Sequence, residues 1–125
     1  MAQKVMLLAL AGAMGTLARW ALAETVQRIV GQGFPWGTVV VNAVGCFCFG
    51  AVFALAGDRL AIGPHGRTII LVGFMGAFTT FSTFISDTSG LLTQAGWLPA
   101  AGNILLHNTA GDLLFFVGLA VGRAA

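Results

Sequence analysis

The residues best suited to chemistry lie in the stretch 76–84, inside a run from 68 to 86 that carries no charged side chain. Within five positions this stretch contains four hydroxyl residues: Thr79, Thr80, Ser82 and Thr83. A helix that faces lipid has no use for hydroxyls, which are expected where backbone is interrupted or where a polar species binds or passes. The alternative is that each hydroxyl bonds back to a carbonyl of its own helix.

Aromatic residues and glycines accompany these hydroxyls. Phe78, Phe81 and Phe84 recur at every third position, which makes a slowly drifting aromatic stripe along one side of a helix. Gly73 and Gly76 would let the helix break and let another backbone approach closely. We therefore predict a break in this helix.

The composition indicates the environment of this stretch. Of the 125 residues, 58% are hydrophobic and 8% are charged, against roughly 25% charged residues in soluble domains. The chain is therefore predicted to be a single all-α integral membrane domain in a lipid bilayer. A net charge of +2 from so few charged residues does not suggest nucleic-acid binding.

Four apolar segments each approach the roughly 20 residues that a spanning helix needs. They are residues 5–23, 37–57, 68–92 and 98–121. Loops are expected at 27–33, 58–67 and 94–97. An even number of spans places both termini on one side of the membrane. That side carries the larger number of Lys and Arg residues, which favours cytoplasmic termini. The charge difference is small, so the chain could insert in both orientations.

Small residues indicate close helix packing. Four short helices cannot enclose a water-lined path by themselves and still cover their polar groups. Small residues stand at spacings suited to helix contact, among them Ala11 with Gly15 and Gly118 with Gly122. We infer a homo-oligomer, most simply a dimer.

Polar residues in the first two spans have two interpretations each. Arg19 lies inside the first span, where a charge is costly and normally faces protein with a partner, although a residue near a helix end could instead snorkel to the interface. Thr38 and Asn42 lie four residues apart on one face of the second span. Asn42 could offer N–H donors to an anion or hydrogen-bond across helices.

The fourth span carries Asn108 and Asp112 on a shared face. Asp112 is near mid-span, where it is expected to be neutral or paired. At about 1.5 Å per residue, Arg19 lies about 22 Å up the first span and Asp112 about 21 Å down the fourth. Those depths differ within one subunit and coincide in an antiparallel partner. We therefore hypothesise a contact between Arg19 and Asp112 of oppositely oriented subunits.

Several other classes of site lack support. Neither His65 nor His107 has a carboxylate or histidine at ligand spacing, so we do not expect a metal site built from side chains. The sequence shows no nucleophile–base pair, phosphate-binding loop or dinucleotide fingerprint, so we do not expect an enzyme.

The chain resembles the Fluc (CrcB) family of fluoride channels over essentially its whole length. The most specific motif is GFMGAFTTFSTF at 73–84. Supporting motifs in the family's order are GTLARW at 15–20, PWGTVVVN at 35–42 and NTAG at 108–111.

This resemblance implies a dual-topology, antiparallel dimer with two pores that exports fluoride passively across a bacterial inner membrane. It implies that Phe81 and Phe84 line the pore. Further residues of the fluoride path would be Asn42, Ser82, Thr83, Thr38 and Asn108. It also implies a central sodium ion held by backbone carbonyls, at positions matching Gly76 and Thr79, and it matches Arg19 with the family's arginine in the first span.

Three positions depart from the family pattern. Asp112 stands where a serine is usual, so the carboxyl is neutral or paired, or this pore is impaired. Ile85 and Asp87 replace a serine and a glutamate. Two alternatives therefore stay open: a partner subunit that conducts only together with a related second chain, and a small proton-coupled drug exporter. The exporter would need a carboxylate within its first span, and Glu24 is too near the end of that span to serve well.

Overall fold

The computed structural model describes residues 1–58 and 63–125, and these residues form helices joined by short connections. Helix α1 (Ala2–Val30) leads into α2 (Trp36–Asp58), and α6 (Trp97–Ala124) ends the chain. The third membrane segment between them consists of α3 (Pro64–Thr68), the π-helix η1 (Ile69–Met75), α4 (Gly76–Phe78) and α5 (Phe81–Gln94). Within the described residues, four stretches are long and apolar enough to cross a membrane: Ala2–Val30, Trp36–Ala56, Pro64–Gln94 and Trp97–Ala124. This architecture agrees with the prediction of an all-α integral membrane protein.

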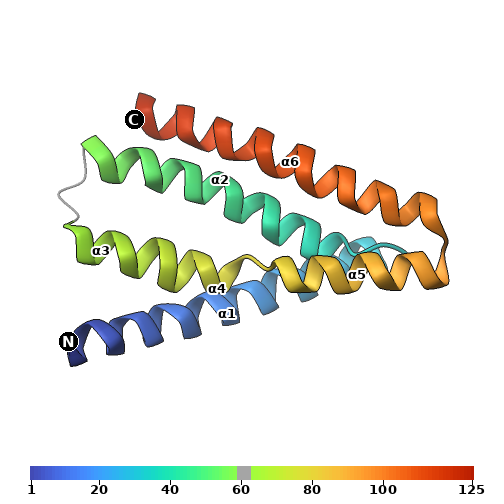
Figure 1. The fold of residues 1–125 in the computed structure, drawn as a ribbon, viewed down its shortest axis with the longest axis horizontal. Coiled ribbons are helices and arrows are strands. Elements are labelled where there is room, and N and C mark those ends of the chain that lie inside the picture. The colour runs from blue at the N-terminus through green and yellow to red at the C-terminus, as the bar shows by residue number, and fades with distance from the viewer. Residues whose placement is uncertain (59–62) are drawn as a thin grey trace.

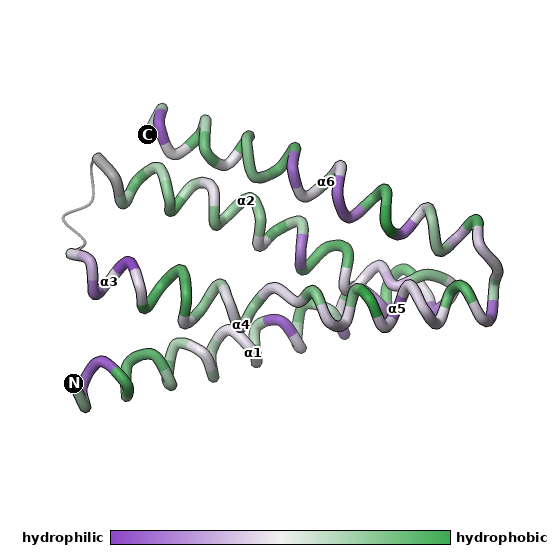
Figure 2. Tube along the Cα trace, viewed as in Figure 1, coloured by the Kyte–Doolittle hydropathy of each residue, from purple (hydrophilic) through white to green (hydrophobic). Residues whose placement is uncertain are grey.

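The helices form an elongated bundle with both chain ends at the same end (Figure 1). Helix α6 packs mainly along α2, and α1 packs against η1 and α4. Hydrophobic positions dominate the length of each long helix, and hydrophilic positions interrupt α6 near its middle (Figure 2). Since lipid offers no hydrogen-bond partners, helices that satisfy their own backbone are the expected form for these apolar segments.

Glycines bring the helix backbones into contact. A side chain added at Gly118 of α6 would overlap the carbonyl oxygen of Phe47 on α2, and one added at Gly50 of α2 would overlap that of Phe115. Likewise, a side chain at Gly15 of α1 would overlap the carbonyl oxygen of Phe74 in η1. Gly15 and Gly118, which the sequence singled out for helix contact, thus serve packing inside one chain.

The predicted loop at 27–33 was wrong for residues 27–30, because α1 continues to Val30. Arg28 Nε donates to Glu24 Oε1 at 2.9 Å, an i,i+4 pair that supports a further helical turn. The Gln27 side chain then stabilises the connection to α2, donating to the carbonyls of Gly31 and Phe34 and accepting from the Gly37 amide. The loop expected at 94–97 is also shorter, since α5 ends at Gln94 and α6 begins at Trp97. Part of the 58–67 loop lies outside the described residues, and its end is helical from Pro64.

Candidate functional site

Residues 79 and 80 lie in extended backbone between α4 and α5. Thr79 has φ −81° and ψ 156°, and Thr80 has φ −149° and ψ 115°. Both values are far from the helical region, so the backbone amides and carbonyls around them need partners outside a regular helix.

Asn42 of α2 supplies two of those partners. Its Nδ2 donates to the Thr80 carbonyl at 3.0 Å, and its Oδ1 accepts from the Thr80 amide at 2.8 Å. The side-chain amide therefore pairs with both polar groups of one backbone residue. Asn42 thus hydrogen-bonds across helices, which is one of the two roles predicted for it.

Thr80 also caps the N-terminus of α5. Its hydroxyl oxygen accepts from the Thr83 amide at 3.3 Å, and its O–H donates to Thr83 Oγ1 at 3.0 Å. Such a cap satisfies one of the free amides at a helix start. The Thr83 hydroxyl accepts this bond, so its own hydrogen stays available as a donor.

These bonds affect the two carbonyls at Gly76 and Thr79. In a continuous helix, the Thr80 amide would donate to the Gly76 carbonyl and the Thr83 amide to the Thr79 carbonyl. Here those amides donate to Asn42 Oδ1 and to Thr80 Oγ1 instead. The helical donors of both carbonyl oxygens are therefore engaged elsewhere.

A cavity of about 420 Å³, the arginine cavity, lies beside this turn. Its polar lining residues are Thr16, Arg19, Thr38, Thr80 and Thr83. The N-terminal end of α5 carries partial positive charge from its unpaired amides. An arginine, four threonines and a helix N-terminus thus border one cavity of an apolar bundle, a combination suited to an anion.

A second cavity of about 270 Å³, the phenylalanine cavity, is lined by Asn42, Gly45, Cys46, Phe49, Thr79, Thr80, Phe81 and Phe115. Thr80 lines both this cavity and the arginine cavity. The rings of Phe81 and Phe84 are neighbours, with centroids 5.5 Å apart and planes tilted by 54°. Phe84 is buried, whereas Phe81 is 75% exposed in the single chain.

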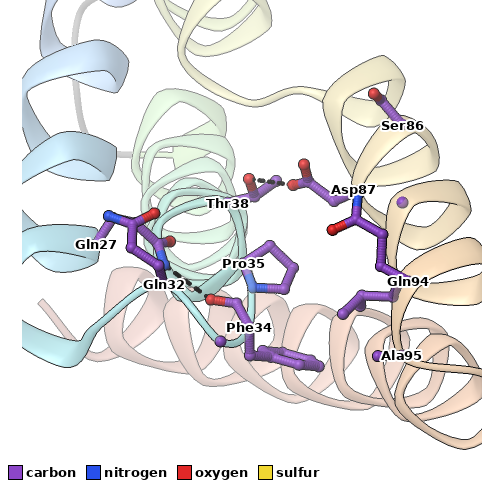
Figure 3. A pocket seen from close by; sticks show the side chains of 12 residues that line it. Gln27, Gln32, Phe34, Pro35, Thr38, Ser86, Asp87, Gln94 and Ala95 are labelled. Carbon is purple, nitrogen blue, oxygen red and sulfur yellow. Dashed lines mark hydrogen bonds between the residues drawn. The ribbon is translucent and has the colours of Figure 1, made fainter.

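A third cavity of about 420 Å³, the mouth cavity, opens between residues 27–38 around the α1–α2 connection and residues 86–95 at the end of α5 (Figure 3). Gln27, Gln32, Asp87 and Gln94 contribute to its lining, and Thr38 lines both this cavity and the arginine cavity. The Thr38 hydroxyl donates to Asp87 Oδ2 at 2.6 Å (Figure 3). Since a threonine has one hydroxyl hydrogen, Thr38 in this arrangement cannot also donate to an anion.

The polar residues of α6 divide between two faces. Asn103 is fully buried and donates to the Thr88 hydroxyl at 2.9 Å, and the His107 ring packs on Phe84 with centroids 4.4 Å apart. Asn108 and Asp112 are exposed in the single chain, and Asn108 bonds back to the Ile104 carbonyl at 2.7 Å. Asn103 was not among the residues predicted from the sequence, and His107 was considered only as a metal ligand. Their four-residue spacing on one helix face was the available signal.

Arg19 and Asp112 are not paired within one chain. In the described part of the chain, the only ion pair within 4.0 Å joins Glu24 and Arg28. No cluster of three or more metal-binding side chains occurs among those residues either. Ser82 lies exposed at the start of α5, with its Oγ 3.4 Å from Thr80 Oγ1.

The fold and these cavities define a class of protein, a multi-pass membrane protein whose third segment carries polar groups into its interior. The family model described as "CrcB-like protein, Camphor Resistance (CrcB)" matches residues 6–119. The chain belongs to this CrcB family, which confirms the family resemblance of the motifs.

Curated relatives cover nearly the whole chain. A protein of Nitrosococcus oceani is 50% identical over 121 residues, covering 97% of each chain. Proteins of Solidesulfovibrio magneticus and Desulforapulum autotrophicum are each 46% identical over 123 residues, covering 98% of each chain. All three relatives carry the name "Fluoride-specific ion channel FluC".

Proposed function

We propose that this protein is a fluoride-selective channel that lets fluoride leave the cell passively and so lowers its toxic concentration in the cytoplasm. The observation that carries the proposal is the arginine cavity, where Arg19 and the hydroxyl-capped start of α5 meet inside the membrane segment. The names of the relatives support fluoride as the ion. Their bacterial sources agree with the location that we propose, a bacterial inner membrane.

The physical requirement is replacement of water around a small anion. Fluoride is strongly hydrated, and moving an unpaired ion into an apolar medium costs many kcal/mol. The Thr83 and Ser82 hydroxyls and the α5 amides can replace part of that shell. Phe81 lines the phenylalanine cavity, and the Phe84 ring is its neighbour. The positive edges of these two rings can face the ion where their faces would repel it. We propose that narrow spacing of these donors excludes the larger chloride ion.

The path that we propose follows the shared lining residues. The mouth cavity meets the arginine cavity at Thr38, and the arginine cavity meets the phenylalanine cavity at Thr80. Asp87 at the mouth is held by the Thr38 hydroxyl, while Arg19 supplies the positive charge further in. Asn42 contributes by holding the turn at Thr80, which keeps the hydroxyl donors in place.

A structural sodium ion is part of the proposal. Interrupted membrane helices use freed backbone carbonyls to bind Na⁺. The Gly76 and Thr79 carbonyls fit this role because their helical donor amides are engaged elsewhere, and Gly76 lies exposed on the outside of the bundle. A cation there would add fixed positive charge near the anion path.

A second copy of the chain, in antiparallel orientation, is the proposed partner. Asn108, Asp112 and Ser82 are exposed on a single chain, and polar side chains of membrane segments normally face protein rather than lipid. A dimer would cover them and would bring Arg19 to the depth of the partner's Asp112. If Asp112→Asn and Arg19→Gln each leave dimer stability in detergent unchanged, that contact is absent.

The test is fluoride efflux from liposomes that contain only the purified protein. A potassium ionophore lets K⁺ leave with the anion, so that no membrane potential opposes anion efflux. Fluoride should then leave rapidly without a proton gradient, while chloride is retained. Protein-free liposomes provide the control. Efflux that appears only with a related second chain would assign a partner-subunit role, and proton-dependent export of organic cations without fluoride efflux would contradict the proposal.

A further inference from the structure

The contact between α5 and α6 contains a buried hydrogen-bond acceptor. Asn103 Nδ2 donates to Thr88 Oγ1 at 2.9 Å, and the Thr88 hydroxyl donates its hydrogen to the Phe84 carbonyl at 2.7 Å. Because that hydrogen is used, the hydroxyl can only accept from Asn103, which determines the orientation of the amide. Asn103 Oδ1 is then buried with no partner among the described residues.

His107 presents a second acceptor one turn further along α6. Its Nδ1 lies 3.0 Å from the Asn103 backbone carbonyl, which can only accept, so Nδ1 carries the hydrogen. In the neutral ring, Nε2 is therefore a bare acceptor. Nε2 is buried and unpartnered within the described ranges 1–58 and 63–125.

Neutral His107 would oppose an anion at this place, because the Nε2 lone pair points outward from the ring. A proton on Nε2 would reverse this: the atom would become a donor, and the ring would carry a positive charge. The imidazole lies against Phe84 with centroids 4.4 Å apart, and Phe84 neighbours Phe81. The reversal would therefore occur beside the aromatic pair of the proposed path.

The described charged residues around protonated His107 do not supply its counter-ion, so an anion could take that role. The elements packed against α6 are α2 and α5. Their titratable residues with described side chains are Cys46 and Cys48 on α2 and Asp87 on α5, and Asp87 accepts from Thr38. On α6 itself, Asp112 is exposed and lies about 140° around the helix from His107, and Arg123 is in the last turn. Among these residues, no carboxylate oxygen lies within 4.0 Å of a His107 ring nitrogen.

We propose that His107 forms the α6 wall of the ion path and that fluoride occupies the position beside Phe84 together with one proton on His107 Nε2. This inference rests on the proposed function. Hydronium on the side from which fluoride enters gives its proton to Nε2, so one O–H bond breaks and one N–H bond forms. When fluoride moves on, the proton returns to water on that same side, the N–H bond breaks, and no proton crosses the membrane. Fluoride conduction should then increase as the pH falls.

The first experiment measures fluoride efflux from liposomes between about pH 6 and pH 8, the range in which histidine changes charge. The leak from protein-free liposomes at each pH is subtracted, which removes diffusion of neutral HF. Wild-type flux should rise by up to about tenfold per pH unit as the pH falls. His107→Gln should conduct at a rate independent of pH, and His65→Gln, the matched control on the other histidine, should keep the wild-type slope.

The second measurement follows the ring directly. In His65→Gln, His107 is the sole histidine, so ¹⁵N NMR of histidine-labelled protein in detergent reports only this residue. We expect the Nδ1–H tautomer at high pH, and conversion of part of the signal to the doubly protonated ring when sodium fluoride, but not sodium chloride, is added at fixed pH.

Three outcomes overturn the inference while the proposed function stands: measurable wild-type flux that is independent of pH, a slope that persists in His107→Gln, or a ring signal that does not respond to fluoride. Absence of wild-type flux at every pH would contradict the proposed function itself. In that case the NMR response to fluoride still decides whether His107 binds the ion.

Discussion

Two regions of this bundle use small and polar residues for opposite purposes. Along the contact between α2 and α6, glycines such as Gly50 and Gly118 remove side chains so that backbones touch. Around Thr80, amides and hydroxyls hold extended backbone open beside cavities of about 420 and 270 Å³. The first region closes the protein, and in the proposed function the second admits an ion. Changes in the first should therefore act on folding, and changes in the second on conduction.

The largest effect is expected from Gly118→Val in the closed region. The added atoms would overlap the Phe47 carbonyl oxygen, and backbone cannot move aside as a flexible side chain can. Overpacking typically costs about 1–3 kcal/mol or more, so we expect little folded protein in detergent by size-exclusion chromatography. Gly102→Val is the matched control, because nothing lies within 4 Å of the new Cβ there. Equal yields of the two variants would contradict the close-packing argument.

Asn42→Leu in the open region should abolish most conduction while some folded protein remains. The change leaves the Thr80 amide and carbonyl without the bonds they make at 2.8 and 3.0 Å. An unpaired group costs about 1–3 kcal/mol when fully buried, and these part-buried groups should cost less. Fluoride efflux should fall by more than about tenfold, equivalent to about 1.4 kcal/mol. Asn108→Leu is the matched control, because among the described residues the Asn108 side chain bonds to the Ile104 carbonyl of its own helix. If that variant loses as much flux, Asn108 belongs to the path and the comparison with Asn42 fails.

Phe81→Ile and Phe84→Ile should suppress fluoride flux and leave the proposed dimer intact. Isoleucine keeps an apolar side chain of useful size but has no ring edge to present to an anion. Efflux and size-exclusion profiles of the same preparation distinguish a loss of conduction from a loss of the dimer. Phe116→Ile, an exposed phenylalanine of α6, provides the matched control. Flux equal to wild type in both ring variants would count against the aromatic lining.

The smallest effect is expected for Asp112→Ser. Asp112 is exposed on the single chain and lies on a different face of α6 from His107. Removing a carboxyl from an anion channel should preserve the fluoride flux or raise it modestly, measured in the same efflux assay. Complete loss of flux would show that the carboxyl has a positive role, for example in the contact with Arg19 of a partner.

Much of this architecture could be predicted from residue types alone. Long apolar runs form helices in lipid because the backbone must satisfy itself, so four spans and their order follow from hydropathy. The ends of helices were less predictable. The polar and glycine-rich character of 27–33 predicts a loop, but the pairing of Glu24 with Arg28 and the side-chain bonds of Gln27 support α1 as far as Val30.

The candidate site was predictable only in part. The hydroxyl and phenylalanine pattern at 76–84 identified the segment, because such residues are costly in a lipid-facing helix. Two roles could not be assigned before the fold was known. Asn42 binds the backbone of Thr80, and Thr38 donates to Asp87, 49 positions away in the chain. Such bonds depend on which helices are neighbours, and spacing along one helix does not determine that.

In helix α6, the features that the sequence determines can be distinguished from those that only the tertiary structure determines. The sequence by itself determined that α6 spans the membrane and carries polar residues in two pairs of equal spacing, 103 with 107 and 108 with 112. Only the tertiary structure decided that Asn103 and His107 face α5 while Asn108 and Asp112 face outward. The physical reason is that a helix repeats every 3.6 residues and has no preferred rotation about its own axis. The glycine contacts with α2 set that rotation, and with it the side chains that face the proposed ion path.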